Sequence, residues 1–152
     1  MSPQYKIPIS VLVVIHTPDL QVLLLERVDR PGYWQSVTGS LDREDERPEE
    51  AAVREVREET GLDAGRYRLE NWGIENRFEI YAWRLAQYRP GVTHNTEFTF
   101  GLCLPEKCDV TLAPQEHTRY AWLPWQEAAE KCFSWTNREA ILRLPEMTPR
   151  AS

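Results

Sequence analysis

Basic residues are scarce in this 152-residue sequence: Lys and Arg together number 18 against 24 Asp and Glu, which gives a formal net charge of −6 with histidine neutral. A protein that holds nucleic acid through its phosphates needs a basic surface, so this balance argues against a nucleic-acid-binding protein. It does not exclude a small anionic substrate, because a bound metal ion can supply positive charge. We therefore expect a small-molecule partner.

Long apolar runs and cysteines are scarce as well. The longest aliphatic run, residues 9–15, is far shorter than the ~20 residues of a membrane-spanning helix. No cleavage site of a signal peptide follows it. We therefore expect this run to form a buried strand. The cysteines, Cys103, Cys108 and Cys132, form neither a CxxC pair nor a zinc-binding pattern. An odd, unpaired set suits a reducing compartment. We expect a cytoplasmic protein with no membrane partner, whose cysteines are small core residues.

The overall composition is that of a folded domain, with 41% hydrophobic and 28% charged residues. The length fits one domain covering residues 1–152. Mixed strands and helices in this proportion predict an α/β or α+β sandwich with helices packed on a sheet. Short apolar or alternating runs predict strands at residues 9–15, 22–25, 33–38, 67–72, 78–88, 96–104 and 119–123, and helices are predicted at 51–60, 125–133 and 137–144.

The most informative segment is REVREETGL at positions 54–62. Each helical residue advances about 100°, so Glu55, Glu58 and Glu59 share one face, which we expect on the solvent side. Like charges at these spacings repel one another, and hard divalent cations bind carboxylate oxygens. A merely acidic, exposed helix is the alternative. Nine acidic and four basic residues between positions 42 and 59 leave a local charge of −5, which favours a bound cation.

Together with Gly39 and Glu46, this segment resembles the Nudix box. The family pattern is Gly, five residues, Glu, seven residues, then Arg-Glu-aliphatic-x-Glu-Glu-x-Gly-aliphatic. From Glu46 onward the match is complete, because seven residues precede Arg54. Upstream, six residues rather than five separate Gly39 from Glu46, and the glycine usual just before that first Glu is absent. The departure leaves the conformation of this loop open, but not the helix.

The resemblance implies an α/β/α sandwich, with a mixed sheet covered by helices on both faces, and hydrolysis of a phosphoanhydride bond. It also implies Mg²⁺, or Mn²⁺, held by Glu55, Glu58 and Glu59, which are the expected catalytic residues. A metal ion neutralises the polyphosphate and makes a water more acidic. Arg54 is expected to orient a glutamate by a charge-assisted hydrogen bond, and a glutamate inside or outside the box would be the general base.

Segments outside the box are similar to a group within the family, the bacterial dihydroneopterin triphosphate pyrophosphohydrolases, also described as dATP pyrophosphohydrolases. These segments are WQSVTGS at 34–40, PGVTHNTE at 90–97, EH at 116–117 and SWTNR at 134–138. The likeness implies conversion of dihydroneopterin triphosphate to the monophosphate and pyrophosphate in folate biosynthesis, with dATP as a side substrate. The alternatives are a housecleaning Nudix hydrolase for a non-standard nucleotide and a non-catalytic nucleotide-sensing domain. Sensing domains usually lose box glutamates, which are present here.

The same likeness implies site residues outside the box. Glu116 is expected as a further metal ligand, although an ordinary loop carboxylate is the alternative. Lys6 and Arg27 would contact the triphosphate, and Glu79 would accept hydrogen bonds from the ring. The alternative for Lys6 and Arg27 is an ordinary surface charge. The alternative for the segment of Glu79 is a sheet strand with its aromatic residues in the core. The full set expected at the substrate is Lys6, Arg27, Thr38, Phe78, Glu79, Ile80, Tyr81, His117 and Ser134. The oligomeric state and the number of metal ions stay open.

Overall fold

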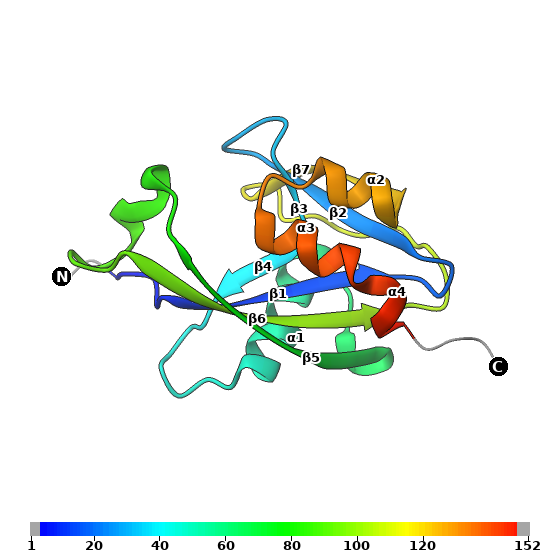
Figure 1. Ribbon diagram of the computed structural model, residues 1–152, viewed down its shortest axis with the longest axis horizontal. Helices are drawn as coiled ribbons and strands as arrows, with labels where there is room; N and C mark the ends of the chain where they lie inside the picture. Colours follow the sequence, from blue (N-terminus) through cyan, green and yellow to red (C-terminus); the bar gives the residue numbers. More distant parts are fainter. Residues whose placement is uncertain (1–3, 149–152) are drawn as a thin grey trace.

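Two parallel strands, β1 (Ile9–His16) and β6 (His94–Cys103), run through the centre of a mixed sheet in the computed structural model, which describes residues 4–148 (Figure 1). The order across the sheet is β3-β2-β1-β6-β5, while β4 pairs with β1 and β7 pairs with β2. The other strands are β2 (Gln21–Arg27), β3 (Trp34–Gln35), β4 (Val37–Ser40), β5 (Arg68–Glu79) and β7 (His117–Pro124).

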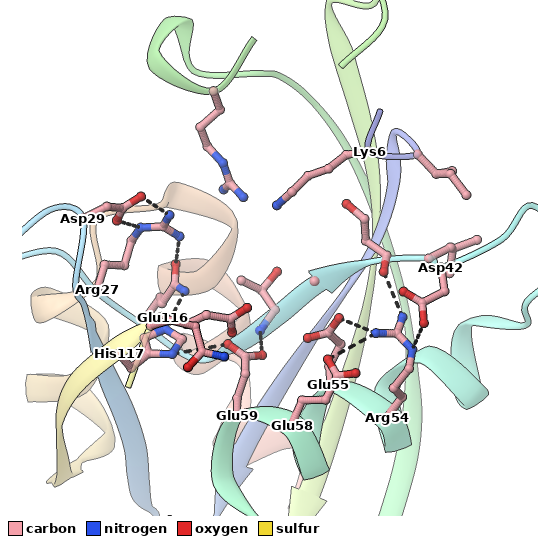
Figure 2. A pocket seen from close by; sticks show the side chains of 18 of the residues that line it. Lys6, Arg27, Asp29, Asp42, Arg54, Glu55, Glu58, Glu59, Glu116 and His117 are labelled. Atoms are coloured by element: carbon pink, nitrogen blue, oxygen red, sulfur yellow. Dashed lines mark hydrogen bonds and ion pairs between the residues drawn. The ribbon is translucent and has the colours of Figure 1, made fainter. Parts of the chain in front are cut away.

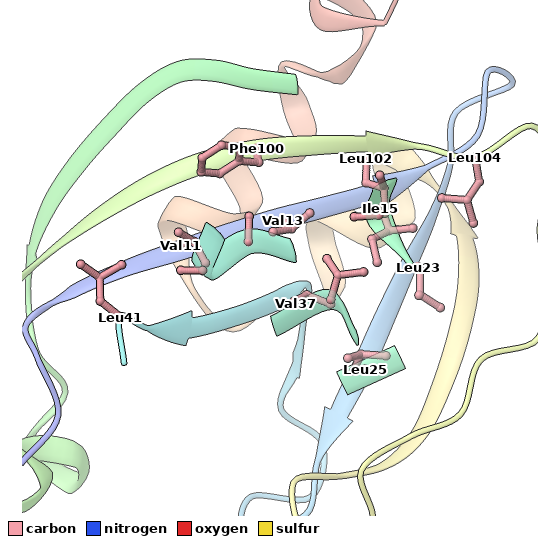
Figure 3. Packing of buried hydrophobic residues seen from close by; sticks show 14 residues of the cluster. Val11, Val13, Ile15, Leu23, Leu25, Val37, Leu41, Phe100, Leu102 and Leu104 are labelled. Atoms are coloured by element: carbon pink, nitrogen blue, oxygen red, sulfur yellow. The ribbon is translucent and has the colours of Figure 1, made fainter. Parts of the chain in front are cut away.

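Helices cover both faces of the sheet, so the predicted α/β/α sandwich is confirmed (Figure 1). On one face, Ala52 and Val56 of the first helix pack with Val13, Phe100 and other apolar residues of the strands (Figure 3). Because helices pack on both sides of β1, its residues 11–15 are all apolar. The helices are α1 (Pro48–Thr60), α2 (Trp125–Lys131), α3 (Trp135–Leu142) and α4 (Leu144–Met147), with short 3-10 turns η1 (Ala64–Arg66) and η2 (Ala82–Gln87).

Strands β1 and β2 diverge after a single backbone pair. They meet at His16↔Val22, and beyond that point β4 takes the place beside β1, in antiparallel register from Val13↔Val37 to Ser10↔Ser40. Strand β2 pairs instead with β3 and β7. The sheet is therefore split at the end where β1 begins and β2 ends, and this opening is where the polar residues of the site gather.

The box helix begins and ends as its sequence predicts. Pro48 occupies the first turn, where its missing N–H costs nothing, and Glu50 accepts the Arg47 backbone N–H at 3.2 Å. At the other end Gly61 has φ +76°, a left-handed conformation that suits glycine, and its N–H donates to the Arg57 carbonyl at 2.9 Å. The expected helix at 51–60 is confirmed and starts three residues earlier.

Two strand predictions were wrong. Residues 67–72 and 78–88 were expected as separate strands, but β5 continues from Arg68 to Glu79, and residues 82–87 form η2. A bulge between Asn71 and Ile74, with Gly73 at φ +71°, lets β5 keep its pairing with β6 across the polar middle of the segment. The expected strand at 33–38 is interrupted at Ser36, whose N–H donates to the Asn137 Oδ1 atom of α3.

The burial of the cysteines agrees in part with the expectation that they are core residues. Cys132 is buried, whereas Cys103 and Cys108 are half-buried, and all three are free thiols. Among residues 4–148 no helix is long and apolar enough to cross a membrane.

Glu26, near the end of β2, generates a testable prediction about stability. Its carboxylate accepts hydrogen bonds from Arg119 of β7 at 2.8 Å and from the Gly32 N–H at 2.9 Å, and these bonds lower its pKa from 4.5 to about 2. The folded-state pKa lies below the unfolded one, so this stabilisation is present above pH 4.5 and is lost as the pH falls towards 2. Glu26→Gln should therefore unfold at a lower urea concentration than the wild type at pH 7. The difference between the two urea midpoints should become smaller as the pH is lowered.

The control for this experiment is Glu130→Gln, which removes an exposed carboxylate on α2. Its difference from the wild type should be small at every pH. If the difference in urea midpoint between Glu26→Gln and the wild type stayed constant as the pH fell below 4.5, the ionised Glu26 carboxylate would not be the source of the stabilisation.

Candidate active site

A polar pocket of about 500 Å³ lies at the open end of the sheet (Figure 2). Its walls come from the segment before β1, the end of β2, strand β4, helix α1 and the loop before β7. Residues far apart in the sequence thus face one space. Eight of the residues expected at the site line it: Lys6, Arg27, Thr38, Glu55, Glu58, Glu59, Glu116 and His117.

The floor of this pocket is a group of carboxylates. Glu59 is only 1% exposed and Glu55 only 8%, so the expectation that the box glutamates face solvent is wrong for these two. Glu58 alone of the three lies at the exposed rim. The sequence could not show that β4 and the loop before β7 fold over this face of the helix.

Burial of these acids has an electrostatic cost. Desolvation raises the pKa of Glu55 to about 7 against the hydrogen bond from Arg54, and it raises the pKa of Glu59 well above its usual range, with Glu55 and Glu116 adding to the effect. A carboxylate oxygen each of Glu59 and Glu116 and a ring nitrogen of His117 lie within 4.8 Å of one another. Oxygen-rich, mutually repelling donors of this kind fit a hard divalent cation, which would remove the cost.

Arg54 organises the acids as the sequence predicts. Its guanidinium donates to Glu55 Oε1 at 2.7 Å, to both oxygens of buried Glu46 at 3.0 and 3.1 Å, and to the Ser40 carbonyl at 3.0 Å. Glu46 in turn accepts the Asp42 N–H at 2.8 Å. This bond closes the loop before α1, so the extra residue between Gly39 and Glu46 is absorbed without disturbing the helix.

Gly39 allows Glu55 to reach its place. A Cβ atom built on Gly39 would lie 2.2 Å from the Glu55 carboxyl carbon, far inside van der Waals contact. The glycine is therefore required by the close approach of a side chain from α1 to strand β4.

The opposite wall of the pocket is cationic. Lys6, Arg27 and Arg84 line it (Figure 2 labels the first two), and the pKa of Lys6 is lowered, first by burial and then by the charges of Arg84 and Arg27. Arg27 is held by Asp29, whose carboxylate accepts two hydrogen bonds at 2.8 Å. Sequence reasoning missed Arg84, because it expected a strand where η2 turns this side chain into the pocket. A cationic wall facing an acidic floor suits a polyphosphate bridged to a metal ion.

Comparison with known proteins agrees with this geometry. Residues 6–144 match the NUDIX domain family. The chain belongs to the Nudix family. It is 44% identical to the dihydroneopterin triphosphate diphosphatase of Escherichia coli (strain K12) over 140 residues, which is 90% of this chain and 91% of that one. It is 41% identical to the Haemophilus influenzae protein of the same name over 143 residues, 91% of this chain and 87% of the other.

Solved structures show the same relationship. The structure of the E. coli dihydroneopterin triphosphate pyrophosphohydrolase superimposes with a TM-score of 0.86 at 43% identity, over 93% of this chain and 97% of that one. A Nudix hydrolase from Listeria monocytogenes superimposes with a TM-score of 0.74 at 24% identity, over 96% of this chain and all of the other. The second likeness shows the fold alone.

His117 lies directly behind the Nudix box carboxylates. It is 2% exposed, and burial lowers its pKa to about 4, so the ring is neutral near pH 7. Its Nε2 lies 3.1 Å from the Gln35 side-chain nitrogen, and its Nδ1 lies 3.6 Å from Glu59 Oε1. If Gln35 donates to Nε2, the proton is on Nδ1 and faces Glu59. Nδ1 has no hydrogen-bond partner among the described residues, so it is left facing the acidic floor beside Glu59 and Glu116.

The remaining expected residues separate into two groups. Phe78, Ile80 and Tyr81 line a second, smaller pocket that adjoins the first. Glu79 and Ser134 line neither pocket. Glu79 is exposed, because side chains alternate along a strand and those of Phe78 and Ile80 take the inner side.

Ser134 and Thr38 use their hydroxyls within the protein. Ser134 immediately precedes α3, and its hydroxyl pairs with that of Thr136 at 2.9 Å. The Thr38 hydroxyl donates to the Val11 carbonyl at 2.9 Å, while its backbone N–H donates to Glu59 at 3.2 Å. Thr38 thus links strand β4 to the acidic floor.

Gly39→Ala tests the packing of the Nudix box against β4. The added methyl group must displace the Glu55 carboxyl, so the variant should stay folded but bind Mg²⁺ about ten- to a hundred-fold more weakly, as measured by calorimetric titration. The matched control is Gly65→Ala, where the nearest atom to the new Cβ is an exposed Asp63 oxygen at 3.2 Å. Equal Mg²⁺ affinity in folded Gly39→Ala and wild type would show that Glu55 is not positioned by this contact.

Proposed function

We propose that the protein hydrolyses dihydroneopterin triphosphate to dihydroneopterin monophosphate and pyrophosphate with Mg²⁺ as cofactor. Two curated relatives with identities of 44% and 41%, each aligned over most of its length, carry the name dihydroneopterin triphosphate diphosphatase. The observation that carries the proposal in this chain is the pocket itself, in which buried carboxylates face a wall of cations. Both features are those that a metal–triphosphate complex needs.

The acidic floor is the proposed metal site. Glu55, Glu58, Glu59 and Glu116 would hold Mg²⁺, and Mn²⁺ would also suit these oxygen donors. When bound, the ion supplies positive charge to the polyphosphate and makes a nearby water more acidic. One of these four carboxylates accepts the proton of the attacking water, while the Thr38 N–H and Arg54 keep Glu59 and Glu55 oriented.

The cationic wall is the proposed phosphate site. Lys6, Arg27 and Arg84 would bind the triphosphate oxygens by charge-assisted hydrogen bonds, which fix the chain of phosphates relative to the acids. Phosphate contacts carry no information about the ring, so the same site would accept dATP and other nucleoside triphosphates as side substrates. We further propose that this reaction takes place in the cytoplasm as a step of folate biosynthesis, with the chain acting as one domain.

A product assay tests this proposal. Purified protein should release pyrophosphate and dihydroneopterin monophosphate from dihydroneopterin triphosphate in the presence of Mg²⁺ and should be inactive in excess chelator. Its kcat/KM should be higher for this substrate than for dATP. Glu59→Gln is the inactive control, expected to lower kcat by orders of magnitude because a proposed ligand is lost. Efficient turnover of a non-standard nucleotide with none of the pterin substrate would instead support a housecleaning hydrolase.

A further inference from the structure

The second pocket contains two buried acceptor atoms that nothing else in residues 4–148 satisfies. Glu97 is 5% exposed and Asn95 is 4% exposed, and both line this pocket. The Glu97 Oε1 atom and the Asn95 Oδ1 atom have no hydrogen-bond partner among the described residues. Buried polar atoms are nearly always paired, so two in one pocket indicate a ligand that donates hydrogen bonds to them.

The fold aims both side chains the same way. Asn95 and Glu97 are two residues apart on β6, so they project from the same face of the strand. The Asn95 amide is fixed because its Nδ2 donates to Ser10 Oγ at 2.7 Å, while its Oδ1 has no partner among the described residues. Thr136, on α3, lies close enough to the Glu97 carboxyl for its hydroxyl to lower the pKa of that carboxyl. The Asn95 acceptor is therefore held in place before any ligand arrives, and the Glu97 carboxyl lies two residues along the same face of the strand.

Glu97 is not explained as a structural ion pair. Arg84 is the cation whose charge reaches it, but the two side chains form no ion pair within 4 Å in the described part of the chain, and the Arg84 Nε atom is itself buried without a partner. Burial consequently raises the pKa of Glu97 to about 7 despite Thr136 and Arg84. An acid kept in this position at a cost to the fold is typical of a functional site.

The second pocket continues the phosphate pocket. Thr38, Gly39, Ser40 and Arg84 belong to the walls of both, so a ligand with its phosphates at Arg84 extends its other end towards Glu97. The wall beside Glu97 includes the aromatic rings of Phe78 and Tyr81. Tyr81 is fixed by packing on Trp83 and Phe133, with ring centroids 6.0 and 5.8 Å away. A fixed ring beside two hydrogen-bond acceptors suits the edge of a planar heterocycle. The second pocket, of about 40 Å³, has room for that edge alone, and the rest of the ring would lie in the adjoining pocket of about 500 Å³.

We propose that Glu97 and Asn95 select the ring of the substrate by accepting hydrogen bonds from the adjacent N–H groups of a 2-amino-4-oxopyrimidine edge, as in a pterin. This inference rests on the proposed function and names the ring-specificity residues of the same site. The unpartnered Oε1 of Glu97 and Oδ1 of Asn95 are both acceptor atoms, so together they match an edge that presents a ring N–H beside an amino group. The corresponding edge of adenine presents one donor beside one acceptor. The ring contact first expected at exposed Glu79 is thereby assigned to Glu97 on the neighbouring strand.

Glu97→Gln and Glu79→Gln form a matched pair for the test. Each exchanges one carboxylate for an amide on adjacent strands, but only Glu97 lines the pocket. Glu97→Gln should lower kcat/KM for dihydroneopterin triphosphate by roughly ten- to a hundred-fold while changing that for dATP much less, because only the pterin edge needs two acceptors. Glu79→Gln should leave both values near wild type. Equal changes for both substrates in Glu97→Gln, or no change, would overturn the proposal.

A binding measurement on the wild-type protein separates this inference from the proposed function and does not depend on any variant folding. The probes are pterin, which carries the 2-amino group, and lumazine, which carries a carbonyl in its place, each followed by its own fluorescence during titration. We expect pterin to bind at least ten-fold more tightly than lumazine, whether or not the triphosphate is hydrolysed. Equal affinity, or no pterin binding, would overturn the ring assignment, whereas pterin binding without hydrolysis would overturn only the proposed reaction.

Discussion

The structure depends on keeping several carboxylates out of water beside one another. Glu59 is buried against Glu55 and close to Glu116, and burial raises the pKa of both box glutamates. Such an arrangement weakens a folded protein as these groups ionise, unless a cation joins them. The surrounding residues can be understood as the means by which the fold holds these acids in place: Arg54 binds Glu55, Gly39 leaves room for it, and Thr38 donates to Glu59.

The split in the sheet opens the pocket that these acids line. Because β1 and β2 separate after His16↔Val22, side chains from the end of β2 and from α1 face one another across a pocket. Cations therefore lie opposite carboxylates across this pocket. The adjoining pocket, with Glu97 and its aromatic wall, extends the same opening to a second region of different chemistry.

Short-range sequence patterns predicted the box helix correctly. Contacts between segments far apart in the sequence could not be predicted from such patterns. Helix α1 follows from Pro48, Gly61 and the i, i+3, i+4 spacing of its glutamates, all of which are short-range features. The burial of Glu59 depends on β4 and on the loop before β7, which a helical projection does not include.

The same reason explains the misassigned ring contact. Residues 78–88 carry an apolar and aromatic pattern that suits a strand, yet the chain turns into η2 after Glu79, and this turn brings Arg84 into the pocket. Glu97 has ordinary strand neighbours in the sequence, and only the folded structure shows that its carboxyl is buried and forms no ion pair within the described residues.

The most direct test of the account is to count the protons released when Mg²⁺ binds. Titration calorimetry in buffers of different ionisation enthalpy gives this number. The pKa of Glu55 is about 7 and that of Glu59 is raised well above its usual value, so binding near pH 7 must displace protons. The account predicts net proton release at pH 7 that falls towards zero as the pH is raised past these pKa values. Mg²⁺ binding with no proton release at pH 7, or release unchanged at high pH, would show that the buried carboxylates are not the cation's ligands.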